Sequence, residues 1–152
     1  MLPFTILNAK EKKSINALLE QQWGFTKKLD YVYLMNRKNR IFFTNRDIER
    51  LDTKALRVNS AGVYVGELLH DKELRLSIEG SQLIGKHATK NVVEISKEQM
   101  RQWLKGNDLD IDGLDATFVI IRCGDDLLGS GKVKEGRILN FVPKTRRILA
   151  PD

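Results

Sequence analysis

The chain has 152 residues and a formal net charge of +6, with 41% hydrophobic and 30% charged residues. This apolar share excludes a disordered chain, because it is enough to form a buried core. No apolar run approaches the roughly 20 residues of a membrane helix, and the first residues lack the features of a secretory signal. We therefore expect a globular, cytoplasmic protein that makes no membrane contact.

The charge is unevenly distributed along the sequence. Residues 1–58 contain twelve basic and six acidic side chains, residues 59–129 eight and twelve, and residues 130–150 six and one. Two basic blocks therefore flank an acidic middle. If the blocks meet in the fold they form one positive surface, which favours a polyanionic partner; a solvated basic face is the alternative.

The residue types that carry most enzyme chemistry are scarce. The chain has one cysteine, Cys123, and two histidines, His70 and His87. This excludes an intrachain disulfide and disfavours a structural zinc site. Cys123 follows an apolar run, which favours a strand residue over a nucleophile. We expect no catalytic residue, no metal and no cofactor.

The N-terminal part begins with a helix. Asn8 can cap this helix, and Glu11, three residues later, can return the hydrogen bond. Gly24 can adopt the left-handed conformation that ends a helix. The apolar stripe between these ends consists of Ile15, Leu18, Leu19 and Trp23.

Two strands, at residues 31–34 and 41–43, are predicted next, because both segments are rich in aromatic and β-branched residues. The loop between them is basic, so it is either a phosphate-binding hairpin tip or a solubilising turn. Thr44 and Asp47 then predict the start of a short helix. The residue pattern changes from residue 56 onward, and this change predicts a domain boundary near residues 57–60.

The middle of the chain predicts two strands, at residues 62–69 and 73–76, and then a short helix at 79–87. A strand at 92–95 leads to a helix that Ser96 and Gln99 can cap.

Alternating aspartates occupy positions 108, 110 and 112, as at the start of a calcium-binding loop. The twelfth loop position is Val119 instead of glutamate, and a strand follows instead of a helix. These departures favour a solvated acidic loop over a calcium site.

The C-terminal part predicts a meander of three strands, at residues 117–123, 127–134 and 137–142. Gly129 and Gly131 lie two apart on the second of these strands and permit close approach of another backbone, from the protein itself or from a ligand. The sequence Gly-Ser-Gly-Lys at 129–132 is not a phosphate loop, because it lacks the full motif and no helix follows.

Residues 56–147 resemble the PUA-type RNA-binding domain found at the C-terminal end of RsmF-like Sun-family ribosomal RNA cytosine-5 methyltransferases. The resemblance rests on the strand at 61–67, the helix ending Leu-Lys-Gly at 104–106, the Gly-Ser-Gly-Lys strand, and the segment Leu-Asn-Phe-Val-Pro-Lys-Thr-Arg-Arg at 139–147. Leu139 stands where the family has lysine, and the family's Pro-Ser segment is replaced at 76–79. Neither a glycine-rich methyltransferase loop nor a Pro-Cys pair is present.

The resemblance implies an α+β fold in which a small N-terminal α/β segment, residues 1–57, packs on a PUA-like mixed β-barrel, residues 58–152. It also implies a non-catalytic protein that recognises structured RNA, ribosomal or transfer, in ribosome biogenesis or RNA modification. The residues that we assign to RNA binding are Gly129, Gly131, Lys132, Arg137, Asn140, Lys144, Arg146 and Arg147, with Arg37, Lys38 and Arg40 of the N-terminal basic loop.

The alternative is a protein-interaction module that docks a separate RNA methyltransferase or a ribosomal particle. Such a module needs an exposed apolar patch beside the basic face. Binding to RNA without a protein partner would distinguish the two functions.

Overall fold

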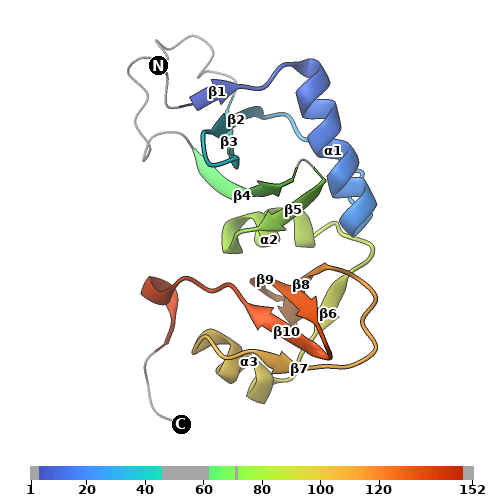
Figure 1. The fold of residues 1–152 in the computed structure, drawn as a ribbon, viewed down its shortest axis with the longest axis vertical. Helices are drawn as coiled ribbons and strands as arrows, with labels where there is room; N and C mark the ends of the chain where they lie inside the picture. The colour runs from blue at the N-terminus through green and yellow to red at the C-terminus, as the bar shows by residue number, and fades with distance from the viewer. Residues whose placement is uncertain (1–3, 46–61, 71, 149–152) are drawn as a thin grey trace.

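The computed structural model describes residues 4–45, 62–70 and 72–148. In this part of the chain, three α-helices accompany two five-stranded sheets, one above the other in Figure 1. The predicted α+β class is confirmed. Within the same residues no helix is long and apolar enough to cross a membrane.

The first sheet is an antiparallel meander in the order β1-β2-β3-β4-β5. Its strands are β1 (Phe4–Ile6), β2 (Val32–Asn36), β3 (Arg40–Thr44), β4 (Val63–Leu69) and β5 (Glu73–Leu76). Helix α1 (Ala9–Trp23) runs alongside this sheet (Figure 1). The predicted capping box of Asn8 and Glu11 is confirmed, and Gly24 ends the helix with a φ of 63°.

The second sheet is mixed, with the order β6-β8-β9-β10-β7. It consists of β6 (Val92–Glu94), β7 (Leu109–Asp110), β8 (Phe118–Cys123), β9 (Asp126–Lys134) and β10 (Arg137–Asn140). Strand β6 is parallel to β8, and the other pairs are antiparallel. Helix α3 (Lys97–Leu104) has the predicted capping box of Ser96 and Gln99 and buries Trp103.

The second sheet differs from the prediction at two places. Leu109 and Asp110 pair with β10, where we expected a solvated loop, because the Leu109 side chain is buried with Trp103. Strand β10 ends at Asn140, two residues early. The Asn140 side-chain oxygen accepts a hydrogen bond from the Val142 N–H at 2.7 Å, which turns the chain out of the sheet. A short 3-10 helix, η4 (Lys144–Arg146), follows.

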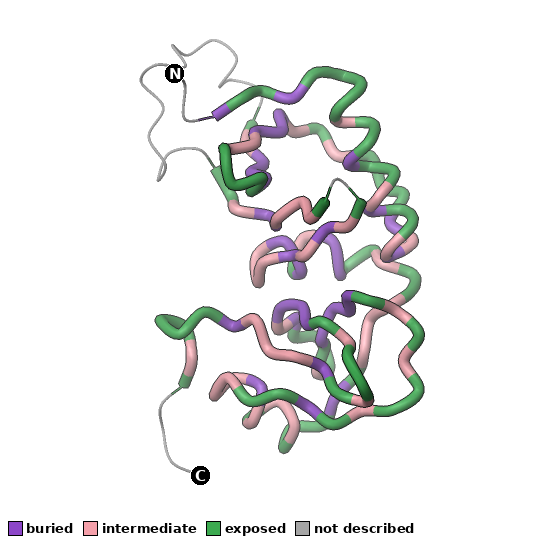
Figure 2. Tube along the Cα trace, viewed as in Figure 1, coloured by how far each residue is buried: buried purple, intermediate pink, exposed green. Residues whose placement is uncertain are grey.

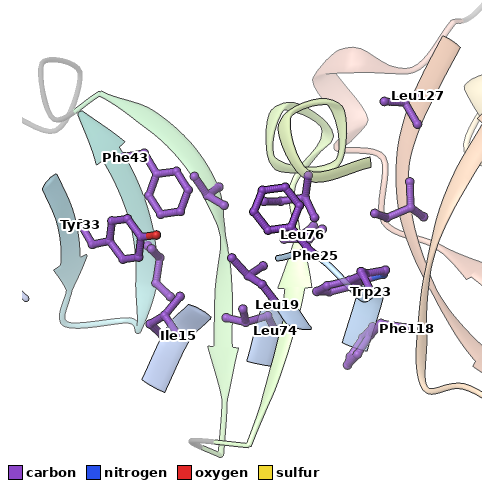
Figure 3. Packing of buried hydrophobic residues seen from close by; sticks show 14 of the residues in the cluster. Ile15, Leu19, Trp23, Phe25, Tyr33, Phe43, Leu74, Leu76, Phe118 and Leu127 are labelled. Atoms are coloured by element: carbon purple, nitrogen blue, oxygen red, sulfur yellow. The ribbon is translucent and has the colours of Figure 1, made fainter. Parts of the chain in front are cut away.

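Helix α2 (Ile78–Gly85) lies between the two sheets, capped by the Ser77 side chain. The largest core cluster includes residues of α1, the first sheet, α2, β8 and β9. Figure 3 shows Leu76 between Phe43 on one side and Leu127 on the other, with Trp23 next to Phe118. The two sheets therefore share one core.

Two predictions concern residues outside the described ones. The short helix beginning near Thr44 and Asp47 falls mostly there, and so does the boundary at residues 57–60. The division into residues 1–57 and 58–152 thus stays a prediction. Backbone pairing between β3 and β4 joins the two predicted segments in one sheet.

The Glu94 carboxylate connects β6 to the end of β8 through two hydrogen bonds. It accepts hydrogen bonds from the Gly124 N–H at 2.7 Å and from Arg122 Nε at 2.9 Å. The Gly124 bond first, and then Arg122, hold the pKa of Glu94 below its ordinary value of 4.5.

The lowered pKa of Glu94 predicts a pH dependence of folding stability. Because the folded-state pKa lies below the unfolded one, the stabilisation is complete above the unfolded pKa and is lost as the pH falls through the folded pKa. We expect the wild type to lose this contribution on acidification below about pH 4.5, and Glu94→Gln to lack that step. Urea unfolding from neutral pH into the acid range measures it; a constant difference between the two proteins would contradict the assignment.

Candidate nucleic-acid interface

A cleft of about 380 Å³ opens between the two sheets. One wall comes from the first sheet and the start of α2, and the other from β9 and the segment after β10. Its lining residues are Arg40, Tyr64, Arg75, Leu76, Ser77, Ile78, Glu79, Gly129, Ser130, Phe141, Val142, Pro143 and Arg146. In Figure 1 the red C-terminal segment continues outward from the end of β10, and in Figure 2 this segment is mostly exposed after Val142.

Two arginines in this cleft lie over aromatic rings. The Arg40 guanidinium, from β3, is 5.8 Å from the centre of the Tyr64 ring on β4. The Arg75 guanidinium, from β5, is 4.8 Å from the centre of the Phe141 ring. Arg75 also forms an ion pair of 3.1 Å with Glu67, which fixes the guanidinium in place. Such cation–π contacts attract a guanidinium to the face of a ring.

A third arginine, Arg146, also lines the cleft. Arg146 of η4 forms an ion pair with Glu79 in the first turn of α2, so it connects the C-terminal segment to the helix between the sheets. The cleft lining thus carries three guanidinium groups against the single carboxylate of Glu79. Because Arg40 belongs to the N-terminal basic block and Arg146 to the C-terminal one, the two blocks meet here.

The Tyr64 hydroxyl remains protonated at neutral pH. Burial raises the pKa of Tyr64 above its ordinary value of 10.0, and the neighbouring Arg40 and Arg75 offset only part of this effect. The cleft therefore presents Tyr64 as a neutral ring with a polar end, which suits stacking and hydrogen bonding.

The two predicted glycines differ in their surroundings. Gly129 lines the cleft with a φ of 106°, a conformation that favours glycine. Gly131 is buried on the other side of β9, where a Cβ would overlap Ile138 and lie 2.9 Å from Trp103. The sequence leaves open whether atoms of the protein or of a ligand approach the two glycines. At position 131 the approaching atoms belong to the protein itself.

Three other predicted site residues have partners within the protein. The Asn140 amide nitrogen donates to the backbone carbonyls of Trp103 and Asn107. Arg137 forms ion pairs with Asp108 and Asp110, and Arg147 Nε donates to the Val142 carbonyl. These contacts hold the C-terminal segment in position. Whether these residues also contact RNA stays a prediction.

The remaining predicted cations are exposed outside the lining of the cleft. Lys132 extends from β9 on the face that carries Ser130, and Lys144 lies in η4. Arg37 and Lys38 lie at the turn between β2 and β3, next to Arg40. Of the predicted site residues, the structure brings Arg40, Gly129 and Arg146 together in the cleft, and the others lie outside its lining.

The alternating aspartates have a structural use, since Asp108 also accepts a hydrogen bond from the Asn140 backbone N–H at 2.8 Å. Among the residues that the structure describes, no group of three or more His, Cys, Asp or Glu side chains is arranged to hold a metal ion.

One part of the chain, which contains the second sheet, α3 and η4, is similar to a known protein family. Residues 90–148 match the family model of the methyltransferase RsmF PUA domain. This match confirms the resemblance seen in the sequence. It begins just before β6 and ends just after η4, so it covers all strands of the second sheet.

Two curated relatives match nearly the whole chain. Both are ribosomal RNA small subunit methyltransferase F of Vibrio cholerae serotype O1, from strains M66-2 and ATCC 39315 / El Tor Inaba N16961. The identity is 26% over 144 residues, which is 93% of this chain. The chain spans only 30% of the length of these relatives. The similarity therefore extends beyond residues 90–148 into the first sheet.

Residues 90–148, which match the family model, supply only one wall of the cleft. On the opposite wall, only Arg40 was predicted from the sequence; Tyr64, Arg75 and Glu79 were not. Alternating polarity does place Arg75 on a strand, but no local pattern predicts that its side chain meets Phe141, 66 positions later in the sequence.

Proposed function

We propose that this chain binds structured RNA across the cleft between its two sheets. The observation that carries the proposal is the convergence of Arg40, Arg75 and Arg146 on one cleft, from segments far apart in the sequence. A guanidinium keeps its charge at all physiological pH values and binds phosphate oxygens through a planar fork of donors. Two exposed lysines within the residues that match the PUA family model, Lys132 and Lys144, extend the positive surface.

The relatives narrow the choice of RNA. Their name assigns them to ribosomal RNA of the small subunit. We propose that this chain binds the same class of RNA, in the cytoplasm, in RNA modification or ribosome biogenesis. The described residues would bind and orient the RNA and would take no part in catalysis. Transfer RNA is the second RNA to test.

A charge-removal variant tests the proposed interface. This variant changes three residues to glutamine together: Lys132, Lys144 and Arg146. Each positive charge that neutralises a phosphate releases counterions and contributes about 0.9 to the slope of log affinity against log salt. We expect affinity for small-subunit ribosomal RNA to fall about tenfold or more at moderate salt, and the slope to flatten by about 2 to 3. Fluorescence anisotropy across a salt series measures both quantities.

The matched control changes Lys10, Lys13 and Lys97 to glutamine, which removes the same charge from α1 and the start of α3. We expect this control to bind nearly as well as the wild type. Equal losses in both variants, or equal wild-type affinity for heparin and RNA, would mean a nonspecific basic surface. Weak binding by all three proteins would instead favour the protein-interaction module.

A further inference from the structure

We infer that the cleft receives one unpaired nucleotide of the bound RNA, whose base stacks on the aromatic and guanidinium groups of the lining. The inference rests on the proposed function, because it concerns the form of RNA that this surface selects. It is carried by the two ring–arginine pairs, Tyr64 with Arg40 and Phe141 with Arg75.

The rings lie inside the cleft, which distinguishes this site from a surface that binds only the RNA phosphate backbone. Phosphates on the outside of a duplex can be bound by exposed cations such as Lys132 and Lys144. Bases within a duplex are stacked on their neighbours, so they cannot reach a ring set in a cleft between two sheets. A base from a bulge, loop or end can leave the stack and lie on an aromatic side chain or an arginine plane.

The size of the cleft suits one such nucleotide. Its volume of about 380 Å³ lies near the lower end of the range for small-molecule sites. The lining is mixed, with two rings, the Gly129 backbone and three guanidinium groups, of which Arg146 is paired with the Glu79 carboxylate. This combination matches a nucleotide, which has flat apolar faces and an anionic phosphate.

The guanidinium of Arg75 is held in position before any ligand arrives. Glu67 binds it on one side at 3.1 Å, and the Phe141 ring lies 4.8 Å away. A fixed side chain loses less conformational entropy when a ligand binds, which favours affinity. Arg75 lies on β5 of the first sheet and Phe141 in the segment that follows β10 of the second sheet, so a stacked base would contact both halves of the molecule.

Two RNA hairpins with the same stem test the inference. In the first, a single 2-aminopurine nucleotide forms a bulge; in the second, the same nucleotide is base-paired. We expect the full chain to bind the bulged hairpin about tenfold more tightly, since stacking of one base on a protein ring is worth a factor of this order. We also expect 2-aminopurine fluorescence to be quenched on binding only in the bulged hairpin.

Two variants locate the site. Arg75→Lys keeps the charge but removes the plane, and Phe141→Leu removes the ring; each is expected to abolish the preference for the bulged hairpin over the paired one. Tyr31→Leu is the control, because Tyr31 is also half-buried but lies outside this cleft. Thermal unfolding checks that every variant is folded. If Phe141→Leu is unfolded, Arg75→Lys alone decides the test.

The outcomes separate the two proposals. Equal affinity of the wild type for both hairpins, or a bulge preference that survives Arg75→Lys, would overturn the nucleotide site and leave RNA binding intact. Binding to neither hairpin, nor to small-subunit ribosomal RNA, would overturn the proposed function and the inference together.

Discussion

Replacing Trp103 with alanine is expected to lower the free energy of unfolding by about 4 kcal/mol. Trp103 is fully buried in the core of the second sheet, among Ile138, Val119 and Leu109. Its indole N–H also donates to the Leu128 carbonyl at 2.9 Å. The substitution therefore removes a large apolar volume and one buried hydrogen bond. Urea unfolding, followed by far-UV circular dichroism, measures the change.

Two conservative variants separate packing from hydrogen bonding. Trp103→Phe leaves the Leu128 carbonyl without its donor, whereas Trp23→Phe removes an indole N–H that has no hydrogen-bond partner among the described residues. Both tryptophans are fully buried. We expect Trp103→Phe to be the more destabilising by about 1 kcal/mol. Equal costs would mean that the Trp103 hydrogen bond contributes nothing net.

Gly80→Ala is expected to destabilise the fold by about 3 kcal/mol, although alanine is the better helix former. Gly80 lies in the first turn of α2, where a Cβ would overlap the carbonyl oxygen of Val65 on β4. Backbone atoms of a central strand cannot move aside as a side chain can. The helix would have to shift away from the first sheet, which would open the shared core. Thermal and urea unfolding measure the loss.

The control is Gly85→Ala in the same helix. A Cβ there would meet a methyl carbon of Leu127 at 2.8 Å, and a flexible side chain can rotate away. Both changes replace glycine with the better helix former, so the difference between them reports mainly the contact with β4. We expect Gly85→Ala to cost less than half as much; similar costs would show that α2 does not lie close against Val65 in solution.

Local signals in the sequence predicted the helices well. A capping box needs only two residues three apart, and those at Asn8 with Glu11 and at Ser96 with Gln99 both form. Alternation and turn residues likewise predicted β8 and β9 almost to the residue. Strand β7 was missed, because two residues among alternating aspartates carry no strand pattern, and only burial of Leu109 reveals it.

The cleft could be predicted only in part. Charge counts showed two basic blocks, but their meeting depends on the packing of two sheets, which no local pattern encodes. The glycines show the same limit. A pair of glycines two apart predicts a bare backbone, yet only the fold distinguishes Gly129, at the cleft, from Gly131, against Trp103. For Asn140, the amide meets backbone carbonyls that lie more than 30 residues away in the sequence.

The central claim is that one RNA-binding surface spans both sheets. The most direct test is a titration of the isotope-labelled chain, which at 17.4 kDa suits solution NMR, with the bulged RNA hairpin. We predict that backbone amide signals near Arg40, at residues 75–79 and at residues 141–146 shift together and saturate at the same RNA concentration. Shifts confined to one sheet, or centred on α1, would contradict the claim.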